Sequence, residues 1–397
     1  MSPQTVRLAI VLGTLSCVGP FAIDMMLPAM PALAASFSAD VGTAQMTITA
    51  FFLAFGVSQL FWGPWSDAVG RKLPLYVGLA VFIVGSIACA LAPSMNTLIA
   101  ARFVQGLGAA VVMVLPRAII RDVLTGTEAT RLMAMVMLVI SVSPMLAPLF
   151  GSGVIALADW RWIFAVLAIA GVASITLTAT MLPETLKAAD KVPVNFANML
   201  AGTKTLFSSP GFMGLTFIGG FGMASFFVFI ASASFVYTQQ YGLTPTQFSI
   251  AFAINAIGFF GASQLAAGFG ERFGMRNVVA WASAGFAVFT IGLFLLTWAG
   301  FDSLYLLIAM LIGGNACLGL IIPSTMVMAL DDHGDIAGLA SSIGGTLQML
   351  AGSAMVTLAA PFFDGTSLPM TAAIALCGVC AFTLSRLLLS RRIRAAA

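Results

Sequence analysis

The sequence predicts an all-α integral membrane protein with twelve transmembrane helices in two pseudo-symmetric six-helix halves. Three observations support this. The 397 residues are 60% hydrophobic and 8% charged, whereas soluble domains carry about 25% charged residues. The apolar runs are continuous rather than alternating, which favours helices over a barrel. A pattern of acid, glycine and base occurs twice, half a chain apart, and indicates two related halves.

The repeated pattern lies in Gly63 to Lys72 and returns in weaker form in Glu271 to Arg276. Each copy stands between two apolar runs, so we expect each to be a tight, charged turn at a membrane face. Aligning Asp67 with Glu271 gives an offset of 204 residues (271 − 67). This echo is the basis for expecting two halves of the same architecture.

Twelve apolar runs follow one another along the chain, each about long enough to cross a hydrocarbon core as a helix. We expect spans at roughly 8–32, 45–64, 73–92, 97–118, 130–157, 161–182, 211–236, 247–269, 277–299, 304–329, 337–360 and 369–389. The longest polar connection, Pro183 to Pro210, separates spans six and seven. We therefore expect a six-helix half at 1–186, a cytoplasmic linker at 187–209 and a second six-helix half at 210–397.

Lysine and arginine collect on one side of the expected spans, and the opposite loops hold only Arg161. Basic loops face the cytoplasm, and an even number of spans places both termini on one side. We therefore expect both termini in the cytoplasm. The residues on the basic side are Arg7, Arg71, Lys72, Arg121, Arg131, Lys187, Lys191, Lys204, Arg272, Arg276, Arg386, Arg391, Arg392 and Arg394.

Asp24 and Arg102 are charged residues inside expected spans. At 1.5 Å per residue, Asp24 lies about 24 Å from the inner face and Arg102 about 7 to 8 Å inside the outer end of span four, so their depths are similar. Ionisable groups at such depth are costly and usually face the bundle interior. A desolvated carboxyl there can exchange a proton. The sequence leaves open whether the two residues touch, and whether Asp24 is only a structural acid near a helix end.

The polar and soft residues of the spans are consistent with an adaptable apolar cavity. The second half carries the intramembrane amides Asn255, Gln264, Asn315 and Gln348, and its span seven is rich in phenylalanine. Spans four and five carry glycine and proline at Gln105 to Gly108 and at Pro144 to Gly153. These residues permit close helix packing, or a flexible seam in a moving bundle.

The sequence argues against an enzyme, a metal site and a cofactor. The five cysteines lie in apolar runs, and Cys377 and Cys380 have metal spacing without further cysteine or histidine ligands nearby. The single histidine, His333, lies in an expected loop, and no phosphate-binding loop is recognisable. No long basic block indicates nucleic acid, and the two-half repeat disfavours a channel.

Together these motifs resemble the major facilitator superfamily. Gly63 to Lys72 is similar to its loop signature between spans two and three. Arg102 to Gly108 resembles the span-four signature of proton-coupled members, and Pro144 to Gly153 resembles the span-five signature of antiporters. Further stretches resemble the Bcr/CflA drug-resistance subfamily: Asp24 to Pro31, Arg117 to Asp122, Trp160 to Phe164, Leu182 to Leu186, and Asp335 to Ser342.

The resemblance implies a drug:proton antiporter of the bacterial inner membrane that works by alternating access. It would export small neutral or amphiphilic compounds such as phenicol-type antibiotics, as a monomer in the lipid bilayer and without a cofactor. Proton coupling is expected at Asp24 and Arg102. The expected substrate cavity comprises Ile23, Leu27, Gln105, Met145, Phe221, Phe226, Asn255 and Asn315. The expected cytoplasmic gate comprises Gly63, Asp67, Gly70, Arg71 and Arg121, and the antiporter motif comprises Pro144, Pro148 and Gly151.

Two positions depart from the family pattern. Ala68 replaces the arginine that often follows the loop aspartate, which predicts a weaker cytoplasmic lock. Ser16 stands eight residues before Asp24, where some drug antiporters carry a second acid, which argues against multi-proton coupling and efficient export of cations. The alternative within the same fold is a symporter or exporter of a small metabolite such as a sugar. The proline–glycine pattern of span five argues against that alternative.

Overall fold

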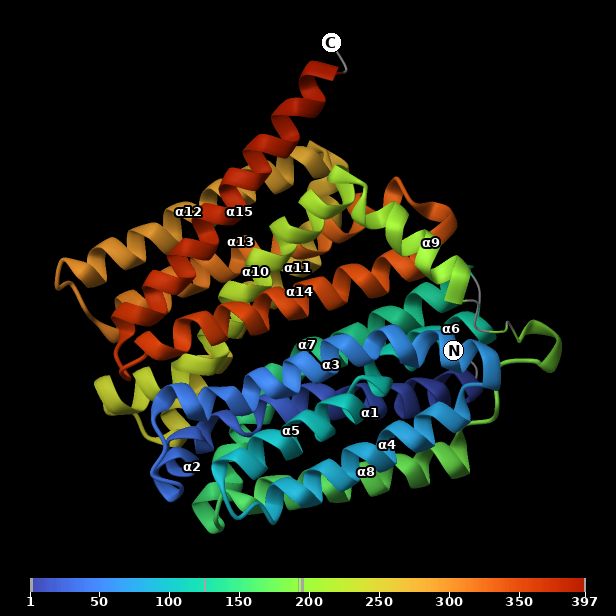
Figure 1. Cartoon of the computed structure of the whole chain (residues 1–397), viewed down its shortest axis with the longest axis horizontal. Helices are drawn as coiled ribbons and strands as arrows, with labels where there is room; N and C mark the ends of the chain where they lie inside the picture. The colour runs from blue at the N-terminus through green and yellow to red at the C-terminus, as the bar shows by residue number, and fades with distance from the viewer. Residues whose placement is uncertain (1–2, 125, 192, 194–195, 396–397) are drawn as a thin grey trace. The chain divides into compact units, whose positions relative to one another are not determined.

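The computed structural model describes residues 3–124, 126–191, 193 and 196–395, and every regular element in these ranges is helical (Figure 1). The chain forms two compact units, Met1–Asn195 and Phe196–Ala397. Twelve helical segments within the described ranges are long and apolar enough to cross a membrane, six in each unit. The predicted all-α fold with twelve membrane-spanning helices is confirmed.

Unit 1 contains the first six spans, which the chain builds from eight helices. These are α1 (Pro3–Asp24), α2 (Met30–Ser36), α3 (Val41–Val69), α4 (Lys72–Ala90), α5 (Met95–Ala109), α6 (Val111–Val123), α7 (Gly126–Leu157) and α8 (Arg161–Met181). The turn η1 (Leu27–Ala29) joins α1 to α2 within span one, α5 and α6 together form span four, and η2 (Ala188–Asp190) follows span six. Helices α3 and α4 pack on α5, α4 also packs on α8, and α1 packs on α7 (Figure 1).

Unit 2 contains the other six spans. Its helices are α9 (Phe196–Phe207), α10 (Pro210–Phe235), α11 (Pro245–Phe273), α12 (Met275–Trp298), α13 (Leu304–Asp331), α14 (Ala337–Ala359) and α15 (Ser367–Ala395). The π-helical turn η3 (Val236–Gln240) extends α10, while η4 (Gly334–Ile336) and η5 (Ala360–Phe362) flank α14. Helix α10 packs on α13, α14 and α15, and α12 packs on α13 and α15.

The expected linker at 187–209 contains a helix, α9, whose buried residues Gly202 and Leu206 lie on the side that packs on α10 and α14. Residues 192, 194 and 195 of that linker lie outside the described residues. The side chains of Arg391, Arg392 and Arg394, which we counted on the basic side, also lie outside the description. The predicted boundaries of the two halves stay a prediction.

The charged turns are shorter than predicted. Helix α3 continues through Gly63 and Asp67 to Val69, so only Gly70 and Arg71 separate it from α4. Gly70 has a φ of +112° and Gly274, between α11 and α12, has a φ of +82°. A residue without a Cβ adopts this conformation at low cost and ends the helix. The two glycines are 204 residues apart (274 − 70), the same offset as in the sequence pattern.

The first span is not one continuous helix, because it breaks at Asp24. Pro28 and Pro31 have no backbone N–H to bond the carbonyls four residues earlier, so α1 ends at Asp24 and the chain continues through η1 into α2. Helix α7 packs against this break. A Cβ on Gly151 would overlap the carbonyl oxygen of Met25, so the contact requires glycine.

Gly151 and Gly153 form a matched pair for testing this contact, because a Cβ on Gly153 would meet nothing within 4 Å. We expect Gly151→Ala to lower the free energy of unfolding by about 1 to 3 kcal/mol through overpacking. Gly153→Ala should leave that free energy nearly unchanged. Thermal melting of the two purified variants in one detergent measures the difference. Equal melting midpoints would show that α7 does not press on the break.

Candidate functional site

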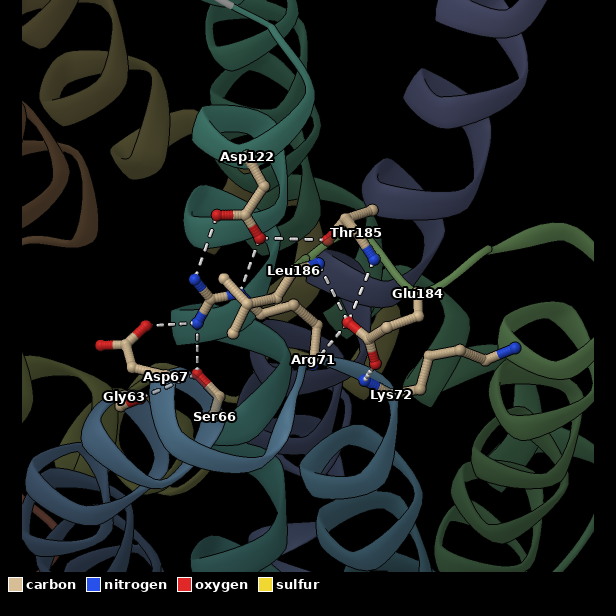
Figure 2. Close-up of polar contacts among 9 residues, drawn as sticks. All are labelled: Gly63, Ser66, Asp67, Arg71, Lys72, Asp122, Glu184, Thr185 and Leu186. Carbon is tan, nitrogen blue, oxygen red and sulfur yellow. Dashed lines mark hydrogen bonds and ion pairs between the residues drawn. The ribbon is translucent and has the colours of Figure 1, made fainter. Parts of the chain in front are cut away.

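The larger polar site of unit 1 is centred on the Arg71 side chain, which is 4% exposed (Figure 2). Its guanidinium donates from Nε and Nη2 to both carboxylate oxygens of Asp122, at 2.7 and 3.0 Å. Its Nη1 donates to Asp67 at 2.5 Å and to the Ser66 hydroxyl at 2.8 Å. We call this site the Arg71 cluster, with the members Ser66, Asp67, Arg71, Asp122, Glu184 and Thr185.

Glu184 accepts hydrogen bonds from backbone groups at the start of α4. Its Oε1 accepts from the Arg71 N–H at 2.9 Å and its Oε2 from the Lys72 N–H at 3.1 Å, while the N–H groups of Thr185 and Leu186 also donate to Oε1. A carboxylate at this position satisfies helix N–H groups that lack intrahelical partners. Gly70 leaves room for it, because a Cβ there would lie 2.8 Å from Oε2.

The electrostatics of the cluster follow from burial and hydrogen bonding. Burial alone would lower the pKa of the Arg71 guanidinium, but hydrogen bonds and attraction from Asp122 and Asp67 raise it above its ordinary value. Burial would raise the pKa of Glu184, but the four backbone donors lower it below the ordinary value of 4.5. Arg71 and Glu184 are therefore both charged at neutral pH.

The Arg71 cluster joins four segments that are distant in the sequence. Asp67 belongs to α3, Arg71 precedes α4, Asp122 ends α6, and Glu184 follows α8. The Thr185 hydroxyl closes the group by donating to Asp122 at 3.1 Å (Figure 2). The cluster thus holds the ends of spans two, three, four and six together within unit 1.

The sequence predicted only part of this cluster. Gly63, Asp67, Gly70 and Arg71 do come together, with the Gly63 carbonyl accepting from Ser66 at 2.8 Å. Arg121 is exposed and makes no hydrogen bond or ion pair with a described residue. Asp122, which accepts two hydrogen bonds from Arg71, appears in the sequence analysis only at the end of the stretch from Arg117 to Asp122. Its position next to the end of span four, on the same side as Arg71, was the signal that could have identified it.

A second polar site lies deeper, where Arg102 is fully buried in span four. Its Nε donates to the Thr47 carbonyl at 3.3 Å, and its Nη1 donates to the Ala22 carbonyl at 3.0 Å and to Gln105 Oε1 at 2.5 Å. Its charged plane lies 4.4 Å from the centre of the Phe51 ring. We call this arrangement the Arg102 cage. It supplies the carbonyl and aromatic partners that a buried cation requires.

Asp24 lies next to this cage and outside it. Its side chain is 4% exposed, and it makes no ion pair with Arg102 or with any other described base. Arg102 instead donates a hydrogen bond to the backbone carbonyl of Ala22, two residues before Asp24. One further nitrogen of Arg102, Nη2, is buried and has no partner among the described residues. Arg102 is therefore bonded to the backbone beside Asp24 but not to the Asp24 carboxyl.

The residues expected to line a substrate cavity fall into two groups. Ile23, Met145, Phe221 and Phe226 are half-buried and keep accessible surface. The other four, Leu27, Gln105, Asn255 and Asn315, are buried.

Two of the buried residues have polar partners that explain their positions. The Gln105 amide joins Arg102 to the Ser86 hydroxyl at 2.8 Å, so it supports the cage in this conformation. Asn255 donates to the Tyr237 hydroxyl at 3.1 Å within unit 2. The prolines of the antiporter motif, Pro144 and Pro148, are buried inside a continuous α7.

Comparison with protein families gives one match over most of the chain, since the model described as "Major Facilitator Superfamily" matches residues 12–356. Among curated proteins, the chain is 34% identical over 371 residues to "Uncharacterized MFS-type transporter YdgK" of Bacillus subtilis, covering 93% of this chain and 92% of that protein. It is 28% identical to "Bicyclomycin resistance protein homolog" of Haemophilus influenzae, covering 96% of each chain. It is 29% identical to "Multidrug resistance protein D" of Escherichia coli, covering 90% and 89%.

Solved structures agree on the fold. A D-xylose-proton symporter aligns with a TM-score of 0.74 at 14% identity, covering 96% of this chain and 97% of that one. The nucleoside transporter NupG aligns with a TM-score of 0.75 at 12% identity, covering 98% and 99%. At these identities the likeness concerns the fold alone.

The Glu184 carboxylate gives a pH-dependent prediction. Because its folded pKa is lowered, its stabilising contribution is fully present above the ordinary value of 4.5 and is lost as the pH falls through the lowered value. We expect Glu184→Gln to melt at a lower temperature than the wild type at neutral pH. The gap should narrow as the pH falls below 4.5. Glu271→Gln, at an exposed acid of α11, is the control, and a gap that does not change with pH would contradict the role of the carboxylate.

Proposed function

Because the chain belongs to the Major Facilitator Superfamily, we propose that it is a proton-coupled antiporter that exports drugs by alternating access. It is a multi-pass membrane transporter and not an enzyme, and several relatives are named for resistance to drugs. We place it in the bacterial inner membrane with both termini in the cytoplasm. Its proposed substrates are small neutral or amphiphilic compounds such as phenicol-type antibiotics, one of which appears in the name of a Pseudomonas aeruginosa relative.

One observation carries the proton coupling: Asp24 is a buried carboxyl at a helix break, without a cation bonded to it. A buried carboxyl in that state is stable when protonated and costly when charged. It binds a proton when its surroundings exclude water, and it releases the proton when a conformational change brings water or a cation to it. Such a cycle couples proton entry to outward movement of drug.

In this proposal Arg102 acts as the positive partner that Asp24 meets during part of the cycle. The cage already binds the Ala22 carbonyl, and Arg102 Nη2 has no described partner. A small rearrangement of the break at Asp24 would allow that nitrogen to bond the ionised carboxylate. Gly151 presses on the same break through Met25, which gives the antiporter motif a physical role.

The proposed cytoplasmic gate of unit 1 consists of the Arg71 cluster together with Gly63, Gly70 and Arg121. Drug contact is proposed for the half-buried Ile23, Met145, Phe221 and Phe226. The buried Leu27, Gln105, Asn255 and Asn315 would take part only after rearrangement. No specific observation supports the alternative of a symporter or exporter of a small metabolite, since the sugar and nucleoside transporters resemble this chain in fold alone.

The proton role of Asp24 has a direct test. In proteoliposomes with an imposed proton gradient, we expect Asp24→Asn to abolish uphill export of chloramphenicol, because the amide cannot release a proton. The variant should keep its thermal stability, since the buried side chain makes no ion pair with a described residue. An uncoupler should abolish wild-type export in the same assay. Full gradient-driven export by Asp24→Asn would overturn the assignment.

The gate role of Asp67 has a separate test. Its side chain is 51% exposed, so its pair with Arg71 is worth about 1 kcal/mol or less, enough to shift an equilibrium between conformations that differ by a few kcal/mol. We expect Asp67→Asn to slow turnover several-fold while changing the drug dissociation constant little. Asp159→Asn, which breaks the exposed pair with Arg161, is the matched control. Equal turnover in both variants would contradict the gate role and would show that Asp67 is only a solvated turn residue.

A further inference from the structure

Helix α6 carries two arginines whose charges are not neutralised within the described part of unit 1. Arg117 and Arg121 are both exposed, and neither makes a hydrogen bond or an ion pair with a described residue. They differ in this from Arg71 and Arg102, whose guanidinium groups have several partners each. The acids nearest in the sequence are engaged as well, because Asp122 bonds Arg71 and Thr185.

The position of these arginines makes their isolation costly. Arg117 lies six residues before Val123, the end of span four, which is about 9 Å along a helix. Residues four apart lie next to each other on a helix, and like charges at that spacing repel. A cation inside a span normally faces water or a partner. Because Arg117 is exposed, its guanidinium is accessible to water or to a polar partner from outside unit 1.

An apolar side chain precedes the two cations on the same helix face. Met113 lies one turn before Arg117 and is half-buried. It packs on α1, because a Cβ on Gly19 would lie 3.5 Å from its Cγ. We call Met113, Arg117 and Arg121 the Arg117 stripe. From Met113 to Arg121 the helix rises by eight residue steps, or about 12 Å. The stripe thus runs from a soft thioether that adapts to apolar groups to a pair of guanidinium groups.

We propose that the Arg117 stripe binds small organic anions, with Arg117 and Arg121 holding an oxyanion and Met113 contacting the apolar body. Guanidinium groups bind carboxylates through charge-assisted, often bidentate hydrogen bonds. The inference rests on the proposed export function and adds a substrate class to it, organic acids carrying an apolar group. An oxyanion of the same kind is also present on phospholipid headgroups, so the experiment must separate the two sources.

The test uses two fluorescent probes that differ only in charge, dansylglycine and its neutral amide, dansylglycinamide. Binding is measured to the full chain in phosphatidylcholine nanodiscs. We expect Arg117→Gln to weaken dansylglycine binding about tenfold, which corresponds to about 1.4 kcal/mol, and to leave dansylglycinamide binding nearly unchanged. Arg121→Gln should act in the same direction. Arg272→Gln, at an exposed arginine of α11 in unit 2, should change neither.

Three results would overturn the proposal. The first is equal loss of both probes in Arg117→Gln with an unchanged melting midpoint, and the second is loss of neither probe. The third is displacement of dansylglycine from the wild type by phosphatidylglycerol in the nanodiscs, together with binding of that lipid that depends on Arg117, because the stripe would then be a headgroup site. The assay needs no proton gradient. Lost chloramphenicol export with intact anion binding would therefore count against the proposed function alone.

Discussion

A guanidinium removed from water must have its charge and its N–H groups satisfied, and unit 1 meets this requirement at Arg71 by converging four segments on one side chain. Asp122 provides two parallel hydrogen bonds, Asp67 and Ser66 share a third nitrogen, and Glu184 occupies the start of the following helix. Removal of one partner from such a buried group leaves the others desolvated. The geometry of the span ends in unit 1 therefore depends on this one residue.

The Arg102 cage meets the same requirement by different means. Here the partners are mainly neutral, since two backbone carbonyls, the Gln105 amide and an aromatic face surround the cation. A cation held by neutral groups keeps its full charge available to a carboxylate that approaches later. In the Arg71 cluster, the charge of the arginine is paired with the carboxylates of Asp67 and Asp122. In the cage, the charge of Arg102 is not paired with a carboxylate of the described residues. This contrast supports the proposal that the second site, and not the first, provides the positive partner of Asp24.

The sequence predicted the fold well because a membrane span can be recognised by its length and its apolar composition. It also located the repeated turn, since Gly70 and Gly274 both adopt a positive φ that favours glycine. It misjudged where the turn begins, because the expected turn started at Gly63 whereas α3 continues through Gly63 and Pro64 to Val69. It did not identify Asp122 as the main ligand of Arg71, because the two residues lie 51 positions apart in the sequence. It also could not show that Arg102 would bind the Ala22 carbonyl, because every residue has a backbone carbonyl and the sequence does not indicate which one accepts a hydrogen bond.

Gly70 and Gly274, which have positive φ at equivalent turns, reveal a difference between the units. At the shared offset of 204 residues, the position that follows Gly70 is Arg71, and the position that follows Gly274 is Met275. The same backbone bend is thus locked by charged hydrogen bonds in unit 1, while in unit 2 it is covered by a thioether that packs on Gly270. Protein engineers who need an insertion point for a tag or a rigid fusion partner have reason to choose the turn at Gly274. An insertion at Gly70 would pull apart four span ends, whereas one at Gly274 would displace only an adaptable apolar side chain.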